Sequence, residues 1–266
     1  MPGVRLITAL GLLLALTTPV VADPVQIAII IDDLGNNRAL GRQAIALPGP
    51  ITYAVLPLRP YSADLARAAS ERGKEVMLHL PMAASDGRTI GAGGLHLGMD
   101  RDSFAQVVRS SVQSLPQVVG VNNHMGSLLT RHDDAMQWLM EELRCFNRLY
   151  FVDSRTDVRT VARRHARAAG LAHAARDVFL DNEQDAHYIR GQLDRLVAIA
   201  RERGKAIGIG HPYPETLAVL ERELPRLAER GVELVPVSQL VQIERNELLW
   251  HASSSPLPTV AKNSKP

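Results

Sequence analysis

The stretch IAIIIDDLGNN, residues 27–37, places two adjacent carboxylates, Asp32 and Asp33, at the end of a continuous apolar run. Five apolar residues in succession, followed by polar residues and a glycine, predict a short strand that is buried on both faces. In the simplest interpretation, such a pair of aspartates belongs to a surface turn and has no further role. The other strand ends of the chain indicate whether these two carboxylates do more.

Strand-like runs of the same kind recur along the chain and alternate with amphipathic stretches. The predicted strands cover residues 26–31, 51–56, 74–80, 118–121, 149–152, 175–180, 205–209 and 232–235. The predicted helices cover residues 62–72, 103–114, 134–146, 158–169, 188–203 and 214–229. Seven or eight such repeats predict an α/β fold, a complete or incomplete (β/α) barrel, with an open doubly wound sheet as the alternative.

The two ends of the chain differ from this pattern. One early cation (Arg5), an apolar stretch over residues 6–16 and the sequence Val20-Val21-Ala22 predict a secretory signal peptide, residues 1–22, cleaved after Ala22. An uncleaved anchor is the alternative. Residues 23–250 are then one barrel domain, and residues 251–266 a disordered tail. We therefore expect a periplasmic or secreted protein without a stable membrane span after cleavage.

Composition narrows the classes of function. A formal charge of +2 provides no basic surface for nucleic acid. Cys145 is the only cysteine, so no intramolecular disulfide can form, and its helical context predicts a small buried hydrophobe. Residues 81–99 hold five glycines and predict a long loop at the rim of the site, in which His96 is a surface residue. The oligomeric state has no signature in the sequence.

Ionisable or amide side chains end most of the predicted strands. They are Asp32-Asp33, His79, Asn122-Asn123-His124, Asp153, Asp181 and His211. Each alone has a structural explanation, such as a helix cap or a turn. Because strand ends of a (β/α) barrel meet at one mouth, these groups would crowd together there without a compensating cation. Imidazole and carboxylate together suit a borderline divalent ion, so the sequence predicts a metal site, with Zn²⁺ as the expected ion.

These motifs carry a family resemblance. Residues 25–241 resemble the divergent polysaccharide deacetylases, relatives of the carbohydrate esterases that remove N- or O-acetyl groups from glycans. The matching landmarks, in order, are IIIDDLG, HLPM, NNHMGS, FVDSRT, VFLDN and GIGHP. The resemblance implies a seven-stranded, slightly irregular (β/α) barrel and metal-dependent hydrolysis of an amide or ester in an acetylated glycan or peptidoglycan.

The resemblance also implies roles for individual residues. Asp32 matches the general base of the wider superfamily and Asp33 a metal ligand. The superfamily usually takes two histidines from one short segment, which this chain lacks, because His124 is followed by Met-Gly-Ser-Leu. We expect His79 to complete the ligand set with Asp33 and His124, with His211 as the alternative ligand. In the first arrangement, His211 resembles the general acid.

Supporting roles follow in the same way. Asp153 and Arg155 match a loop that orients the base or binds substrate in relatives, and Asn123 is expected either to contact the substrate or to support the residues that do the chemistry. Asp153 or Asp181 is expected to orient one of the imidazoles.

Three functions compete on these grounds. The first is a metal-dependent glycan deacetylase. The second is a non-catalytic relative that keeps the barrel and binds glycan or an envelope protein, which the missing histidine pair and an aromatic content of 4% favour. The third is another metal-dependent hydrolase on the same barrel, because fold alone does not define function.

Overall fold

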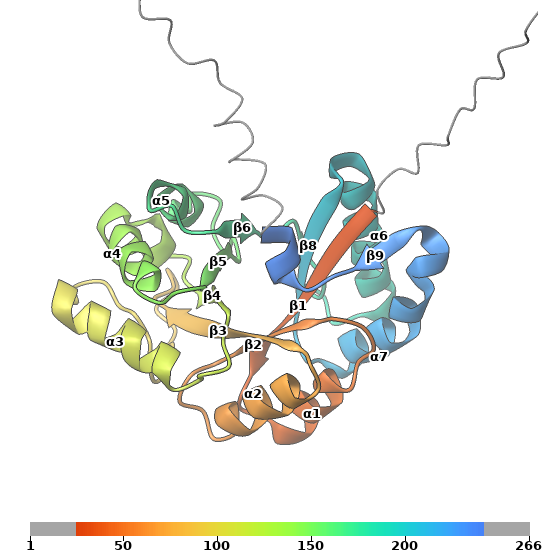
Figure 1. Ribbon diagram of the computed structural model, residues 1–266, viewed down its shortest axis with the longest axis horizontal. Helices are drawn as coiled ribbons and strands as arrows, with labels where there is room; N and C mark the ends of the chain where they lie inside the picture. Colours follow the sequence, from red (N-terminus) through yellow and green to blue (C-terminus); the bar gives the residue numbers. More distant parts are fainter. Residues whose placement is uncertain (1–24, 242–266) are drawn as a thin grey trace, which may run out of the picture.

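A parallel sheet that curls around a common axis forms the centre of the molecule, and helices cover its outer face (Figure 1). The structure is a computed structural model, and it describes residues 25–241. The strands are β1 (Val25–Leu34), β2 (Thr52–Val55), β3 (Glu75–Met82), β4 (Gly120–Met125), β5 (Tyr150–Asp153), β6 (His173–Ala175), β7 (Val178–Phe179), β8 (Lys205–Gly210) and β9 (Val232–Leu234). Their order is β6-β5-β4-β3-β2-β1-β8-β7, and β9 pairs with β1. Because all pairings are parallel, the carboxyl ends of the strands lie at one end of the sheet.

The helices follow the strands in regular alternation. They are α1 (Arg38–Ile45), α2 (Ser62–Glu71), α3 (Arg101–Gln113), α4 (Asp133–Arg144), α5 (Ala162–Ala168), α6 (Ala186–Arg203) and α7 (Pro214–Glu223). Three short 3₁₀ turns, η1 (Leu129–Arg131), η2 (Leu224–Arg226) and η3 (Ala228–Arg230), complete the assigned elements. Residues 237–241 are also helical.

The two edge strands of the sheet belong to one short segment of chain. Only Arg176 and Asp177 separate β6 from β7. The Arg176 N–H donates to Asp153 O at the end of β5, and the Asp177 N–H donates to Ile207 O of β8, both at 2.9 Å. The segment therefore crosses from one sheet edge to the other and closes the ring. Counted as one interrupted strand, β6 and β7 reduce the eight strands of the path to seven, and the predicted (β/α) barrel is confirmed.

Burial on both faces explains why the strands read as continuous apolar runs. In β1, Ile27, Ile29 and Ile31 pack with the helices, whereas Ala28 and Ile30 pack with residues of the barrel interior. All five are fully buried. Alternate residues of β1 thus belong to two different cores, one on each face of the sheet, as expected for a strand covered on both sides.

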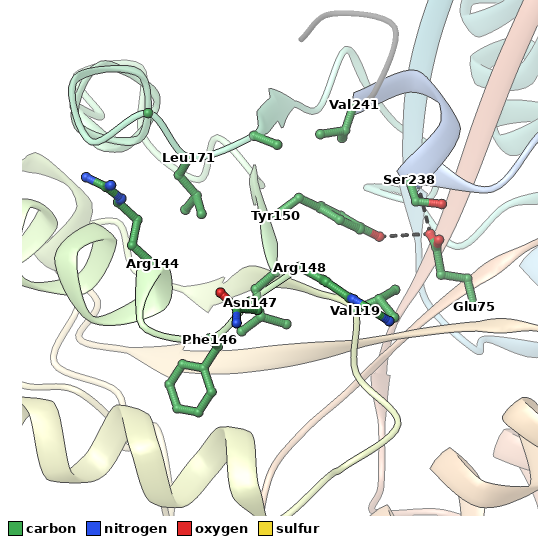
Figure 2. A pocket seen from close by; sticks show the side chains of 13 residues that line it. Glu75, Val119, Arg144, Phe146, Asn147, Arg148, Tyr150, Leu171, Ser238 and Val241 are labelled. Atoms are coloured by element: carbon green, nitrogen blue, oxygen red, sulfur yellow. Dashed lines mark hydrogen bonds between the residues drawn. The ribbon is translucent and has the colours of Figure 1, made fainter.

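The amino-terminal end of the barrel is closed by the chain after β9. Val235, Val237, Leu240 and Val241 belong to the interior cluster. Next to this cluster, Glu75 Oε1 accepts hydrogen bonds from the Tyr150 hydroxyl at 2.8 Å and the Ser238 N–H at 3.1 Å (Figure 2). It also accepts one from Thr52 Oγ1 at 2.9 Å. This end of the barrel is therefore a structural closure.

Several element boundaries differ from those predicted. The helix α1 was not predicted, although the Asn37 side chain caps it by accepting from the Leu40 N–H at 3.0 Å. The predicted helix over 158–169 begins only at Ala162, because the Asp157 carboxylate accepts from the Arg159 N–H and forms a turn first. The predicted helix over 214–229 ends at Glu223, since Pro225 cannot donate a backbone hydrogen bond.

The prediction of a buried Cys145 is wrong. The helix α4 ends at Arg144, and Cys145 is its exposed C-terminal cap. The buried stripe of α4 runs through Met136, Leu139, Met140 and Leu143. Cys145 lies one residue beyond the last turn that this stripe orients.

The terminal segments were predicted but are not described. The proposed signal peptide, residues 242–250 of the proposed domain and the proposed tail all lie outside residues 25–241. Within that range, none of the helices combines the length and apolar character that a membrane span requires.

A glycine at the start of β4 provides a test of the packing below the site. A Cβ added to Gly120 would overlap the Tyr150 ring, which cannot yield freely because its hydroxyl is held by Glu75. We expect Gly120→Ala to lower the free energy of unfolding by about 1–3 kcal/mol, measured by urea denaturation. The control is Gly191→Ala in α6, where an added Cβ meets nothing within 4 Å and should stabilise by about 0.5–1 kcal/mol. Equal effects of the two changes would contradict this account of the packing.

Candidate metal centre

The end of β1 departs from regular strand geometry. Its register against β2 shifts between Ile31 and Leu34, and Asp33 has a left-handed φ of 60°. In a regular strand, consecutive side chains point to opposite faces. Here both carboxylates approach the same imidazole, since His79 Nε2 lies 3.1 Å from Asp33 Oδ1 and 3.6 Å from Asp32 Oδ2. The irregular strand end therefore turns the Asp pair toward one centre.

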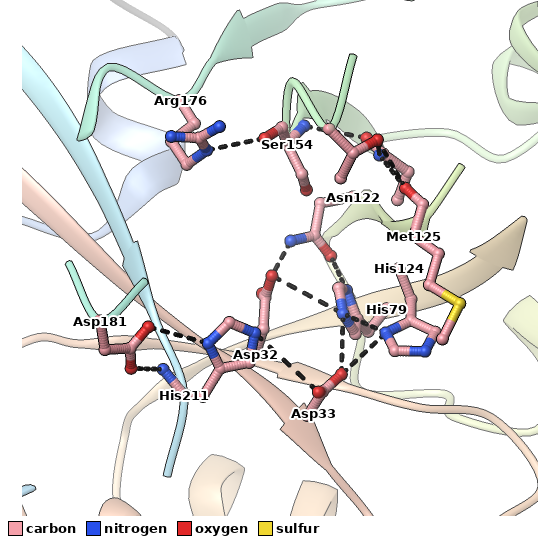
Figure 3. A network of polar contacts seen from close by, with 12 residues as sticks. Asp32, Asp33, His79, Asn122, His124, Met125, Ser154, Arg176, Asp181 and His211 are labelled. Atoms are coloured by element: carbon pink, nitrogen blue, oxygen red, sulfur yellow. Dashed lines mark hydrogen bonds and ion pairs between the residues drawn. The ribbon is translucent and has the colours of Figure 1, made fainter. Parts of the chain in front are cut away.

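Three potential ligand atoms meet at this centre (Figure 3). Asp33 Oδ1 lies 2.8 Å from His124 Nδ1 and 3.1 Å from His79 Nε2, and the two nitrogens are 3.1 Å apart. The β3–β4 register explains the approach of the imidazoles, because His79 pairs with Asn122, two residues before His124. Among the described residues, this trio is the one group whose side chains could hold a metal ion.

The hydrogen bonds around His79 determine which nitrogen faces the centre. The Asn122 amide donates from Nδ2 to Asp32 Oδ1 at 2.8 Å, so its carbonyl oxygen faces His79 Nδ1 at 2.7 Å. This oxygen can only accept, so Nδ1 carries a proton and donates it. In neutral His79 the lone pair of Nε2 then points at the Asp33 carboxylate.

Such an arrangement needs a positive charge. A lone pair and a carboxylate at 3.1 Å repel each other unless a cation or a proton lies between them. Asp33 Oδ1 is buried and lacks a well-directed hydrogen bond. Ligands about 2.1 Å from a tetrahedral Zn²⁺ would be about 3.4 Å apart, so a small expansion of the trio would accommodate the ion. One carboxylate oxygen and two imidazole nitrogens are donors that suit a Zn²⁺-type cation. The Asn122 carbonyl oxygen, which accepts from His79 Nδ1, is the kind of outer contact that orients a histidine ligand.

The ionisation of the trio agrees with this need. Burial would raise the pKa of Asp33, but its close contacts with the His124 and His79 imidazoles outweigh burial and hold the pKa well below its usual range. Burial would lower the pKa of His79, but the charge of Asp32 and the contact with Asp33 raise it overall. The carboxylate is therefore ionised, and the site attracts positive charge.

Asp32 has a different environment from its neighbour. Its side chain is buried, and burial raises its pKa above the usual range despite the nearby charges of His79 and His211. A carboxylate with a raised pKa is a better proton acceptor near neutral pH. The two aspartates thus differ in the way that a ligand and a base would require.

His211 approaches the centre from the opposite side (Figure 3). Its Nε2 lies 3.9 Å from Asp33 Oδ2, and its Nδ1 lies 2.9 Å from Asp181 Oδ1. The second Asp181 oxygen accepts from the His211 N–H at 2.5 Å and from Thr216 Oγ1 at 2.8 Å. Burial would lower the pKa of His211, but the hydrogen bond and charge of Asp181 outweigh burial and raise the pKa to about 9.

The predicted supporting residues Asn123, Asp153 and Asp181 have three different sets of contacts. The Asn123 amide donates to Met125 O and accepts from the Ser154 N–H, so it joins two loops, and the amide at the centre is that of Asn122. Asp153 accepts from the Arg155 N–H and from Thr160 Oγ1, so it closes its own turn. Asp153 or Asp181 was predicted to orient an imidazole. Asp181 contacts the imidazole of His211.

A second arginine, Arg176, lies within electrostatic range of Asp32 and was not predicted. Arg155 is exposed, with a left-handed φ of 51°. Arg176 donates to Ser154 O at 2.7 Å and to Arg155 O at 3.0 Å, and its guanidinium lies over the Phe179 ring. Burial lowers the pKa of Arg176, and the charges of Asp153 and Asp32 act in the opposite direction. Sequence reasoning missed Arg176 because it falls inside a predicted strand, where the chain in fact changes partners.

The chain has relatives across its length. Residues 29–241 match the divergent polysaccharide deacetylase family. The uncharacterized protein YibQ of Escherichia coli is 39% identical over 240 residues, which cover 90% of this chain and 74% of that protein. An uncharacterized protein of Haemophilus influenzae is 34% identical over 220 residues, which cover 83% of this chain and 78% of that protein. The crystal structure of the uncharacterized protein ATU2773 from Agrobacterium tumefaciens superimposes with a TM-score of 0.77 at 25% identity, over 82% of this chain and 89% of that one.

Asn122 provides a test of the ligand arrangement. Asn122→Ala removes the acceptor that orients His79, so we expect the Zn²⁺ affinity of the folded protein to fall about 10–100-fold. The measurement is competition with a chelator of known affinity. Its neighbour provides the control, because Asn123→Ala should loosen the loops and leave metal affinity within about twofold. Unchanged affinity in Asn122→Ala would exclude His79 as an oriented ligand.

Asp181 provides a test of the His211 environment in the metal-free protein. Asp181→Asn removes the charge that raises the His211 pKa from the ordinary value near 6.5 to about 9, so NMR titration should show the pKa falling toward about 6.5. In the wild type, this interaction stabilises the fold fully below about pH 6.5 and is lost as the pH rises through about 9. The variant should lack that pH dependence of stability.

Thr216→Val is the matched control for this titration. It removes one hydrogen bond to Asp181 without changing the charge, so we expect a much smaller change of the His211 pKa than in Asp181→Asn. An unchanged His211 pKa in Asp181→Asn would show that a group other than Asp181 raises it.

Proposed function

Since the chain belongs to the divergent polysaccharide deacetylase family, we propose that it is an exported, metal-dependent hydrolase that removes N- or O-acetyl groups from an envelope glycan. One observation carries the proposal: a ligand trio has a buried carboxylate on one side and an Asp-held imidazole on the other. Hydrolysis of an acetyl group needs a base for water, a cation for the oxyanion and an acid for the leaving group.

Asp33, His79 and His124 would hold a divalent ion, with Zn²⁺ favoured by the donor set. When bound, such an ion acidifies a water ligand and stabilises negative charge on a carbonyl oxygen. Asp33 would contribute the anionic oxygen, and His79 would contribute Nε2 because Asn122 holds its other nitrogen. His124 would contribute Nδ1 from the neighbouring strand.

Asp32 would act as the general base. Its raised pKa favours acceptance of a proton from the attacking water, and its hydrogen bond from Asn122 holds the carboxylate beside the ligand trio. Because the same Asn122 amide contacts His79, one side chain holds both the proposed base and one proposed ligand.

His211 would act as the general acid. Asp181 accepts at Nδ1, which leaves Nε2 directed toward the centre, where the departing amine or alkoxide needs a proton. A pKa raised to about 9 keeps this imidazole protonated at neutral pH.

Export is proposed from the amino-terminal sequence alone. The cation, the apolar stretch and the small residue at position 22 support a signal peptide, and a periplasmic or extracellular location would give access to acetylated glycan or peptidoglycan.

Unequal effects of the two aspartates test the enzymatic proposal. Asp32→Asn should keep the metal and lose about 10²–10⁴-fold in kcat for acetate release from acetylated chito-oligosaccharides or peptidoglycan fragments. Asp33→Asn should lose metal instead, because it removes the charged ligand. Acetate release and metal content are measured on the same preparations.

The outcomes separate the alternatives. Equal loss of metal in both variants would place Asp32 among the ligands. A metal-loaded wild type that releases no acetate from any glycan tested would favour the non-catalytic binding protein.

A further inference from the structure

A cavity of about 330 Å³ opens outside the candidate metal centre, and none of its lining residues belongs to that centre. Its walls come from the end of the loop after β3, from the first turn of α3 and from the first turns of α4. This volume lies at the lower end of the range of about 300–1,000 Å³ typical of small-molecule sites. The cavity could therefore hold one small ring-shaped unit.

The topology places this cavity on the same face as the metal centre. Leu95 pairs with the end of β3, donating to Pro81 O and accepting from the Ala83 N–H, both at 2.9 Å. The paired residue Met82 lies three positions beyond His79, about 10 Å along the strand. On the other side, α4 begins soon after β4, which carries His124. The cavity thus lies outward from the strands that deliver the two imidazole ligands.

Its lining combines apolar and hydrogen-bonding groups. Trp138 and Phe104 meet edge to face with ring centres 5.8 Å apart, and Leu97 is 41% exposed. These two aromatic residues are a third of the six phenylalanines and tryptophans of the chain. An exposed leucine beside a partly exposed indole is apolar surface that lacks a cover among residues 25–241.

Polar groups of the same cavity have unused hydrogen-bonding capacity. Within residues 25–241, the His96, His132 and Asp134 side chains take part in no hydrogen bond or ion pair, and neither does the Trp138 indole N–H. The adjacent Asp133, by contrast, is engaged by Arg164 and His165. The cavity therefore offers two imidazoles, one carboxylate and one indole donor around an apolar wall.

This combination fits a neutral sugar ring better than an ion. The metal-binding group of the described residues lies elsewhere, and the cavity offers an anion no lysine or arginine. A pyranose has C–H faces that pack against the negative face of an aromatic ring, while its rim of hydroxyls satisfies imidazole, carboxylate and indole groups. We propose that this cavity is an accessory subsite for a sugar unit of the glycan whose acetyl group lies at the metal centre. The identity of that glycan as substrate rests on the proposed function.

Chain-length dependence of the kinetics tests the subsite. A sugar unit can bind in the cavity only when the oligosaccharide is long enough to extend there from the metal centre, so acetylated chitohexaose is compared with acetylated chitobiose. We expect His96→Ala and Leu97→Ala to raise KM for chitohexaose about five- to tenfold, the loss of one hydrogen bond or apolar contact, with kcat and the chitobiose KM unchanged. Both side chains are exposed, so these changes should not disturb folding. The control is Val158→Ala, an 89% exposed valine in the loop after β5, which should change neither value.

Fluorescence tests occupancy independently of turnover. The chain has two tryptophans, so in a Trp250→Phe background Trp138 is the single reporter. Titration with chitohexaose should then change the emission saturably, and Leu97→Ala should weaken this response by the same factor as KM.

The two measurements distinguish failure of the subsite from failure of the proposed function. Normal acetate release, with KM unchanged in both cavity variants and no fluorescence response, would overturn the subsite and leave the enzyme proposal intact. A saturable response without acetate release would support the subsite and refute the enzyme.

Discussion

The Asn122 side-chain amide is the contact on which the candidate site depends. It donates to Asp32 and accepts from His79, so one planar group determines the position of the proposed base and the orientation of a proposed ligand. Because an amide has separate donor and acceptor ends, it can satisfy a carboxylate and an imidazole N–H together. Neither partner could exchange its role without leaving a buried polar atom unsatisfied, and such atoms are costly.

The barrel makes this contact possible. Asn122 and Asp32 are 90 residues apart, yet both lie at the carboxyl ends of parallel strands. The opposite end is sealed by the chain after β9 and by the Glu75 hydrogen bonds. Closure at one end and polar side chains at the other place the candidate site at one mouth, the end where (β/α) barrels carry their active sites.

Two imidazoles that are distant in sequence meet in space, as the missing histidine pair would. The two imidazoles come from neighbouring strands, and the register of β3 against β4 brings His79 Nε2 within 3.1 Å of His124 Nδ1. A pair within one segment and a pair across two strands can present equivalent nitrogen atoms to an ion, because coordination depends on the positions of the atoms rather than on their order in the chain. The absence of the sequence motif is therefore a weak argument against metal binding.

The sequence by itself determined the barrel and the identity of the residues that end its strands. Apolar runs such as residues 27–31 specify strands buried on both sides, and this local signal survives in any context that buries them. Only the tertiary structure decided which side chains face the centre. The left-handed Asp33 turns both aspartates inward, and Asn122 rather than Asn123 contacts Asp32. The partner change at Arg176 brings the side chain of that arginine to the Ser154 carbonyl. The reason is physical: side-chain direction at a strand end depends on bulges, register and neighbouring strands, and none of these is encoded within a few residues of sequence.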